Sequence, residues 1–260
     1  MKFLRLAKRK FCSSKGSEEL PLRLIMKEAF GSEFFFARFE YTDKERLPDL
    51  SAGNFVPIKA EGMASPRCFY PLFFDRKTGA FDILAKLARV EDEDKLGEFS
   101  SILANSPKNA TFSAGKPGFF YRLAQSNWLE INRREGEATR LRPESLVIFA
   151  QSTFISSVFW LLESIGRNPF SAPSPSVIFQ PASVLSAPLL DELFAMHSKG
   201  SLRLQILQSS AEPQKSTVEN LILADESQLF LVAGSKEFSQ KIEGLLESEG
   251  VDQKNVLCLS

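Results

Sequence analysis

The chain has 260 residues, of which 43% are hydrophobic and 25% are charged, a composition typical of a globular protein and not of a disordered one. Its formal net charge is zero, so the overall charge gives no reason to expect a nucleic-acid partner. His197 is the only histidine, which excludes catalysis by a histidine-paired nucleophile or a histidine-rich metal centre. Cys12, Cys68 and Cys258 are odd in number and widely spaced, which argues against a disulfide framework and against a zinc site. We therefore predict no bound metal and no nucleic-acid partner.

The first 19 residues form a separate basic segment. Residues 1–16 contain six Lys or Arg and no acidic residue, together with two serines and enough apolar residues for one face of a helix. This composition is typical of a mitochondrial targeting segment. We predict a mitochondrial localisation, with a basic surface extension as the alternative. Whether the segment is cleaved stays open.

Residues 20–142 consist of short apolar stretches separated by turn signals such as LPDLSAG, DRKTG and SPKN. One helix is expected within residues 97–106, where Phe99, Ile102 and Leu103 share a face. Short strands at this spacing predict an antiparallel β-barrel. The candidate strands are residues 33–41, 54–62, 68–74, 80–90, 109–115 and 127–132.

Residues 143–260, after the polar stretch RREGEATRLRPES, have a different order of predicted elements, in which strands alternate with helices. This alternation predicts a doubly wound parallel sheet with helices on both faces. The longest apolar stretch, around Leu146–Leu162, is interrupted by Gln, Ser and Thr, so no membrane-spanning segment is predicted. The predicted strands are 146–150, 177–180, 202–208, 229–232 and 256–259, and the predicted helices are 155–165, 189–197 and 237–249.

Short motifs in the right order resemble those of the ferredoxin-reductase-like flavoproteins, most closely the cytochrome b5 reductase branch. RCFYP at Arg67–Pro71 resembles the family's Arg-x-Tyr-Thr/Ser-Pro flavin motif, and GEFSSIL at Gly97–Leu103 fits its Gly-x-x-Ser-x-x-Leu motif. SAGNFVPI, FDILAKLA, GKPGFF and the FLVAGSKEF segment are similar to four further family motifs. The resemblance implies a Greek-key β-barrel of the FAD type at residues 20–142 and an α/β domain of the NAD(P) type at residues 143–260.

The resemblance also implies an FAD site, and FAD is the candidate cofactor. Arg67 has the forked geometry that suits phosphate oxygens, and the helix start at Gly97–Ser100 would offer free N–H groups to an anion. Phe69 and Tyr70 stand where the family has an aromatic residue and a small hydroxyl, and the sequence leaves open which of the two rings would stack on the flavin. The predicted cofactor-binding residues are Arg67, Phe69, Tyr70, Lys86, Gly97, Ser100 and Ser101.

The nicotinamide half departs from the family pattern. The family's Gly-Gly-Thr-Gly turn becomes Gln151, Ser152, Thr153 and Phe154 here, and its Cys-Gly-Pro segment becomes Ala233, Gly234 and Ser235. A turn that binds phosphate needs glycine, because the missing Cβ lets backbone N–H groups reach the phosphate. The sequence therefore predicts a degraded site that does not bind NAD(P).

These observations favour a non-catalytic accessory subunit of a mitochondrial complex of the respiratory-chain type, with other protein subunits as partners and no catalytic residue of its own. Attachment to a membrane would then occur through those partners. One alternative is an active FAD-dependent oxidoreductase or electron-transfer flavoprotein of the cytochrome b5 reductase type. Another is a purely structural protein that has lost FAD as well.

Overall fold

The computed structural model describes residues 19–30, 34–86, 96–124, 128–134, 137–167, 175–183, 187–208, 213–223 and 227–259. The predicted basic segment lies outside these residues apart from Glu19. The chain forms two compact units, residues 1–122 and 123–260, which are described separately below. The sequence-based boundary at residue 142 stays a prediction.

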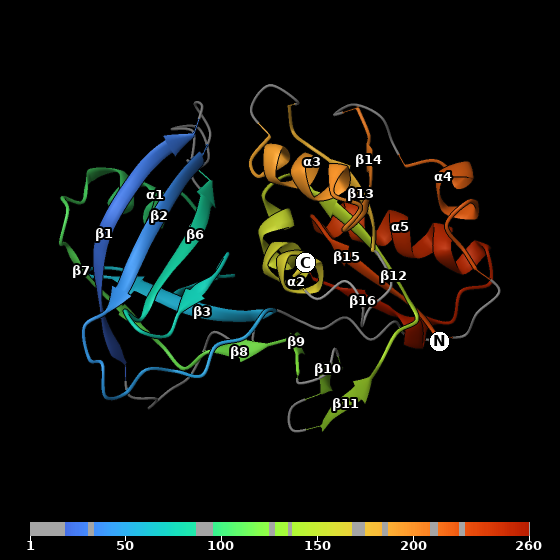
Figure 1. The fold of residues 1–260 in the computed structure, drawn as a ribbon. Helices are drawn as coiled ribbons and strands as arrows, with labels where there is room; N and C mark the ends of the chain where they lie inside the picture. Colours follow the sequence, from blue (N-terminus) through green and yellow to red (C-terminus); the bar gives the residue numbers. More distant parts are fainter. Residues whose placement is uncertain are drawn as a thin grey trace. The chain divides into compact units, whose positions relative to one another are not determined.

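The first unit is built on an antiparallel sheet whose strand order is β4-β3-β7-β1-β2-β6-β5, with β8 paired to β3 (Figure 1). Strand β7 returns beside β1, so β7, β1, β2 and β6 have the spatial order of a Greek key. The predicted Greek-key β-barrel is confirmed. The strands are β1 (Leu20–Phe30), β2 (Phe34–Tyr41), β3 (Asn54–Ala60), β4 (Arg67–Phe69), β5 (Phe74–Asp75), β6 (Ala80–Lys86), β7 (Thr111–Ala114) and β8 (Gly118–Phe119).

Phenylalanine rings fill the interior of this barrel. Phe39 stacks on Phe81 at 6.0 Å between ring centroids and meets Phe112 edge to face at 5.1 Å. Helix α1 (Leu96–Asn105) covers this core with Phe99 and Leu103, both of which are buried. The helix predicted from the spacing of its apolar residues is therefore confirmed.

Strand β1 was not predicted, because its sequence does not alternate regularly between apolar and polar residues. It contains Pro21, and Lys27 and Glu28 are neighbours in its second half. Tertiary pairing makes it a strand: it is antiparallel to β2 from Leu22 to Phe30 and to β7 at Leu20–Arg23. Strand formation depends on such neighbours more than on intrinsic preference.

A small antiparallel sheet of order β11-β10-β9 lies between the two larger ones in the sequence. It comprises β9 (Tyr121–Leu123), β10 (Leu129–Arg134) and β11 (Glu137–Leu141). The polar stretch at the predicted domain boundary thus contains a strand, in which Thr139 pairs with Ile131 of β10.

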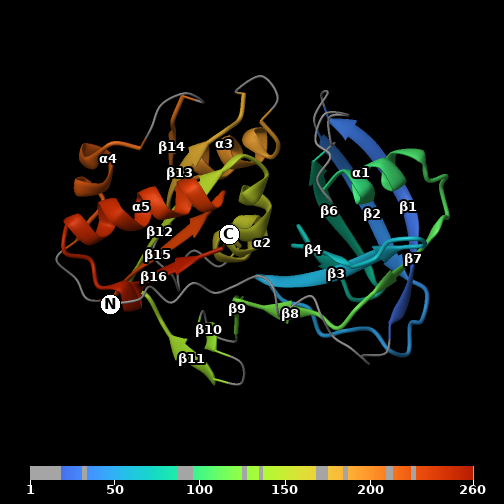
Figure 2. The same cartoon turned by 180° about the vertical axis from the view of Figure 1, so that it is seen from behind.

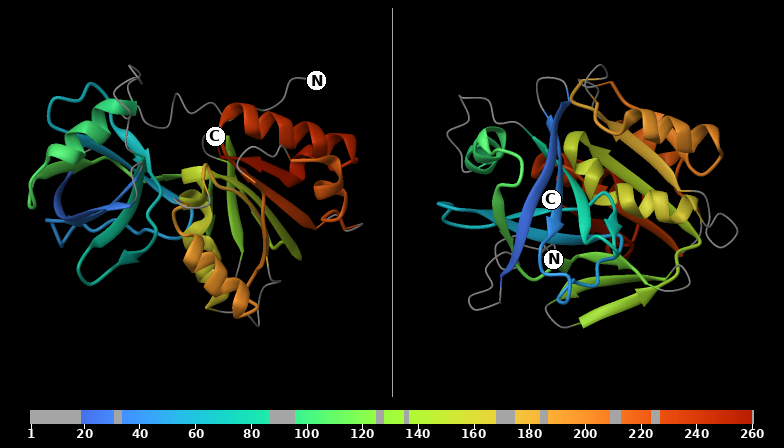
Figure 3. Two further views of the ribbon diagram at one scale, coloured as in Figure 1. Left: turned by 90° about the horizontal axis from the view of Figure 1, so that it is seen from above. Right: turned by 60° about the vertical axis from the view of Figure 1, so that its left-hand side comes forward.

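The second unit is a parallel sheet of order β14-β13-β12-β15-β16. Helices α2 and α3 cover one face, and α4 and α5 cover the other (Figures 2 and 3). The predicted doubly wound architecture is confirmed, although the short helix α4 was not predicted. The strands are β12 (Ser145–Gln151), β13 (Ser176–Gln180), β14 (Arg203–Ile206), β15 (Gln228–Ala233) and β16 (Val256–Cys258), and the helices are α2 (Ser156–Gly166), α3 (Leu190–Ser198), α4 (Lys215–Glu219) and α5 (Lys236–Ser248).

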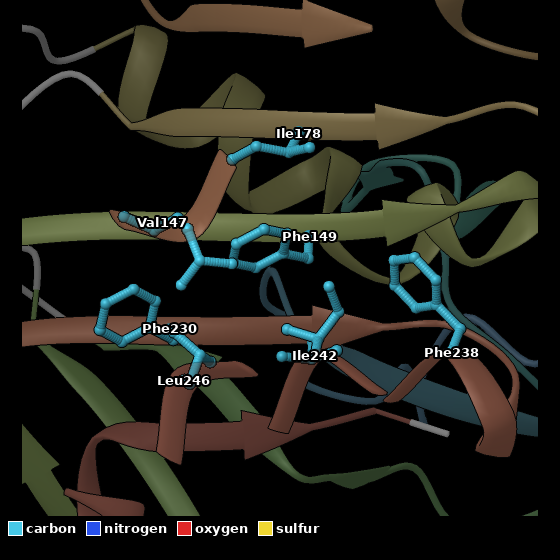
Figure 4. Close-up of a cluster of buried hydrophobic side chains, with 9 residues drawn as sticks. Val147, Phe149, Ile178, Phe230, Phe238, Ile242 and Leu246 are labelled. Carbon is cyan, nitrogen blue, oxygen red and sulfur yellow. The ribbon is translucent and has the colours of Figure 1, made fainter. Parts of the chain in front are cut away.

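Helix α5 packs on the sheet through Phe238, Ile242 and Leu246, which are four residues apart and form one stripe of the helix. This stripe contacts a core that includes Phe149 of β12 and Phe230 of β15, both fully buried (Figure 4). Phe238, in the first turn of α5, lies near the carboxyl ends of these strands. The start of the helix is thereby fixed at the edge of the sheet where ligands of doubly wound domains bind.

Candidate functional site

In the first unit, three of the predicted flavin residues, Arg67, Phe69 and Tyr70, lie on β4 and directly after it, Lys86 ends β6, and Gly97, Ser100 and Ser101 lie on α1. Arg67 pairs with Ile58 of β3, and Phe69 pairs with Val56. The Phe69 ring packs on Phe99 of α1 at 4.7 Å between centroids, so this strand is held against the helix. Tyr70 meets Phe55 edge to face at 6.0 Å.

The Arg67 side chain has a buried Nη2 atom with no hydrogen-bond partner among the described residues. Buried guanidinium N–H groups are normally paired, because leaving one unsatisfied is costly. A phosphate oxygen is an acceptor that suits the forked geometry of arginine. Arg67 therefore fits the role predicted from its motif, as the cation for a phosphate of FAD.

Two contacts fix helix α1, and one of them joins two of the other predicted residues, Ser100 and Lys86. The buried Ser100 hydroxyl donates a hydrogen bond to the backbone carbonyl of Lys86, which places the end of β6 beside the first turns of the helix. At the opposite end, the Lys27 ammonium donates to the carbonyls of Leu103 (3.1 Å) and Ala104, which lie in the last turn of the helix, where carbonyls lack intrahelical donors. Ser101 is exposed on the same helix.

The phenol of Tyr121 is fully buried, and that of the half-buried Tyr70 lies near enough to influence it. Burial raises the pKa of both side chains, and the neighbouring Tyr70 raises the pKa of Tyr121 further. Both hydroxyls therefore stay protonated at neutral pH. Which of Phe69 and Tyr70 would stack on a flavin stays open, since each ring already has an aromatic neighbour.

In the second unit, the chain reverses its direction of winding between β12 and β15, and the carboxyl edge at such a point is where doubly wound domains bind their ligands. Strand β12 ends there at Gln151, and a 3₁₀ turn, Ser152–Ile155, leads into α2. Ser152 has φ of +50°, in the left-handed region that glycine adopts without strain. The backbone thus keeps a glycine-like conformation at this position while carrying a side chain.

The side chain of Gln151 lies across this edge and bridges both neighbouring strands. Its Nε2 donates to Oε1 of Gln180 at the end of β13, at 3.3 Å. Its Oε1 accepts from the backbone N–H of Ser235, directly after β15, at 3.1 Å. Both polar atoms of the carboxamide therefore have hydrogen-bond partners in the protein.

The segment after β15 is closely packed. A Cβ on Gly234 would lie 2.2 Å from Cδ1 of Phe238, so only glycine fits below this ring. Ala233 is buried, and the Ser235 hydroxyl caps α5 by accepting from the N–H of Phe238. In the turn after β12, the carbonyl oxygens of Thr153 and Phe154 accept hydrogen bonds from the hydroxyls of Ser156 and Ser157.

No protein-family model and no curated protein matches the sequence. Solved structures do match. The cytochrome b5 reductase domain of Ulva prolifera nitrate reductase superposes with a TM-score of 0.78 at 16% identity, covering 93% of this chain and 97% of that one. The chain has the ferredoxin reductase fold.

Two further structures with the ferredoxin reductase fold show how far the likeness extends. The CS-b5R domains of human Ncb5or, in the NAD+ form, give a TM-score of 0.73 at 13% identity, covering 94% of this chain and 70% of that one. A ferredoxin NADP+ reductase from Neisseria gonorrhoeae with bound FAD and NADP gives 0.67 at 14% identity, covering 94% and 99%. At these identities the matches show the fold alone.

Placed on the ferredoxin reductase fold, the predicted residues fall into two groups, one in each unit. The contacts of these residues with a cofactor stay predictions. Sequence reasoning missed Lys27, Gln180 and Phe238, because their roles come from contacts with residues distant in the chain. Cys68 is disulfide-bonded, which the cysteine spacing did not predict.

Two further features concern metals and membranes. The described residues contain no group of three or more His, Cys, Asp or Glu side chains placed to hold a metal ion. Over the same part of the chain, none of the helices is long and apolar enough to cross a membrane.

Proposed function

We propose that this chain is an FAD-binding module of the cytochrome b5 reductase type that does not bind NAD(P). In this proposal it acts as a non-catalytic accessory subunit of a mitochondrial complex of the respiratory-chain type. The observation that carries the proposal is the turn after β12, where Ser152 holds a glycine-like φ of +50° and neighbouring positions carry side chains.

The argument against NAD(P) is steric. Backbone N–H groups bind a pyrophosphate only where the chain can approach it closely, which glycine permits and a Cβ hinders. Phe154 adds a partly exposed ring to this turn, and the carboxamide of Gln151 already accepts the N–H of Ser235. These features support the loss of the nicotinamide nucleotide while the fold is kept.

The argument for FAD rests on the first unit. The buried Nη2 of Arg67 lacks an acceptor among the described residues, and α1 is anchored by Ser100 and Lys27. When bound, FAD would supply the capacity to accept and pass on electrons. In this chain Arg67 would hold a phosphate of the cofactor, and the start of α1 would offer backbone N–H groups to it.

The accessory role and the location rest on sequence and surface features. The acid-free basic segment at residues 1–16 has the composition of a targeting sequence. Among the described residues, Met26 and Phe30 are large apolar side chains exposed on the same strand, β1, and these two support a contact with a partner protein.

Calorimetric titration with NADH and NADPH tests the loss of nucleotide binding. We expect no binding heat for either nucleotide, and micromolar affinity for either one would overturn the proposal. The Neisseria gonorrhoeae reductase, whose structure holds NADP, is the positive control.

The second candidate is a working FAD oxidoreductase that takes its electrons from a protein donor, and the unsatisfied Nη2 of Arg67 within the described residues favours it equally. The visible absorbance of the purified protein tests FAD binding in both candidates. We expect a yellow protein that Arg67→Met makes colourless. The control is Arg76→Met, since Arg76 makes an exposed ion pair with Asp49.

The outcomes separate the two candidates. A colourless protein that takes up no added FAD would refute FAD binding in both. A bound flavin that NADH reduces at an enzymatic rate would refute the accessory proposal and support an active oxidoreductase.

Imaging of the full chain fused at its C-terminus to a fluorescent protein tests the location. We expect mitochondrial fluorescence that is lost when the six Lys and Arg of residues 1–16 are replaced by Gln. Mitochondrial fluorescence that survives this replacement would refute the role of the segment.

A further inference from the structure

We infer that the Gln151 carboxamide, held by two hydrogen bonds across the carboxyl edge of the parallel sheet, helps to keep dinucleotides out. This inference rests on the proposed function and gives a mechanism for it. We call the arrangement of Gln151, Gln180 and Ser235 the Gln151 clasp. It lies at the carboxyl edge of β12, between β13 and β15.

One half of the Gln151 clasp involves the start of α5. Ser235 is the N-cap of this 13-residue helix, and its backbone N–H donates to Oε1 of Gln151 at 3.1 Å. The first N–H groups of a helix have no partner within the helix, and the helix dipole favours a negative acceptor there. The carboxamide oxygen carries a partial negative charge, so Gln151 takes the place of an anionic ligand at Ser235.

The other half connects Gln151 with β13. The residues Gln151 and Gln180 are register neighbours in the parallel sheet, and Nε2 of Gln151 donates to Oε1 of Gln180 at 3.3 Å. Gln180 is 8% exposed. Both polar ends of the Gln151 side chain therefore have protein partners on opposite sides of β12, which fixes the carboxamide across the edge.

A dinucleotide that entered this edge would have to displace the carboxamide and break both hydrogen bonds. Each hydrogen bond in a protein is worth a several-fold change in an equilibrium constant, so two together oppose binding by about tenfold or more. The chemical class that the Gln151 clasp excludes is an anion with phosphate oxygens, since the N–H of Ser235 at the start of α5 is a donor of the kind that binds such anions and is already used by Gln151.

Two glycine variants isolate this contribution. The double variant Ser152→Gly/Phe154→Gly removes the two side chains that follow the clasp, and the triple variant adds Gln151→Gly. NADH affinity is measured by fluorescence titration. We expect the triple variant to bind NADH at least about tenfold more tightly than the double variant. Equal affinities, including no binding by either variant, would overturn the inference.

Hydrogen exchange at the Ser235 amide is a second readout that does not depend on NADH. We expect Gln151→Ala to speed this exchange about tenfold, because the Ser235 N–H loses the carboxamide oxygen that accepts its hydrogen bond. Gln228→Ala is the matched control: Gln228 is buried, and its carboxamide forms hydrogen bonds with the backbone of Leu223 and Leu221 at the opposite end of β15. The same Ser235 exchange rate in both variants would refute the Gln151 clasp.

The two failures can be told apart. Micromolar NADH binding by the unmodified chain would refute the proposed function. If the unmodified chain binds no NADH, then equal NADH affinities of the double and triple variants, or equal Ser235 exchange rates in Gln151→Ala and Gln228→Ala, would refute only the Gln151 clasp.

Discussion

The substitution Ser152→Gly is expected to stabilise the protein, although it removes a side chain. Ser152 has φ of +50°, and a residue with a Cβ in the left-handed region loses roughly 1–2 kcal/mol relative to the right-handed one. Glycine removes this strain but gains conformational entropy in the unfolded chain, worth about 0.5–1 kcal/mol. Within the described part of the chain, the Ser152 side chain makes no hydrogen bond that would be lost. The balance is a stabilisation of up to about 1.5 kcal/mol, and each kcal/mol raises Tm by about 2–4 °C in a protein of this size.

Thermal and urea unfolding of the variant and the parent chain measure this difference. The matched control is Ser156→Gly, four residues further along. Ser156 has φ of −58° in the first turn of α2, and its hydroxyl donates to the carbonyl of Thr153. The same replacement there must destabilise, by about 1 kcal/mol from helix propensity and the lost hydrogen bond. If both variants lose stability to the same extent, the turn after β12 carries no left-handed strain and the reasoning is wrong.

Three further changes test the packing and electrostatics of the second unit. Gly234→Ala places a Cβ 2.2 Å from the Phe238 ring and should lower the free energy of unfolding in urea by about 1–3 kcal/mol. Because Phe238→Ala removes the ring that the new Cβ would meet, the double variant should lose less stability than the sum of the two single variants. Gly244 lies in α5 with open space around the place of a Cβ, so Gly244→Ala should instead stabilise the protein by about 0.5–1 kcal/mol. A loss of stability in this variant would contradict the open surroundings of Gly244. Burial and the carboxylate of Glu243 raise the pKa of the Cys258 thiol, so we expect slow alkylation by iodoacetamide at pH 8, increasing only at higher pH. Glu243→Gln should lower this pKa and speed alkylation, and an unchanged or slower rate would show that the carboxylate does not act on the thiol.

Regular elements were predicted well wherever the sequence carries a local signal. The alternation of strands and helices after residue 145 predicted every strand of the parallel sheet, because buried parallel strands are short apolar runs between polar turns. Strands β1 and β11 lack such a signal. Hydrogen bonds to β2, β7 and β10 make them strands.

The candidate site also has a part that local residue types indicate and a part that depends on contacts between distant residues. Arg67 and the side chains of the turn after β12 were found from residue type and order, since a phosphate site needs a cation or glycines whatever surrounds it. The contacts of Lys27 and Ser100 could not be found this way. Each acts on a backbone carbonyl in another element, Lys27 at a distance of 76 residues from Leu103 in the sequence.

The sequence by itself determined that this chain has the ferredoxin reductase fold without the glycine turn of a nucleotide site, because both conclusions depend on local residue types. Only the tertiary structure decided what Gln151 does there. Its partners, Gln180 and Ser235, lie 29 and 84 residues away, and the parallel register of β13, β12 and β15 brings all three together. Hydrogen bonds between such distant residues form only where parallel strands pair, and the pairing of strands that are far apart in the sequence is a property of the tertiary structure.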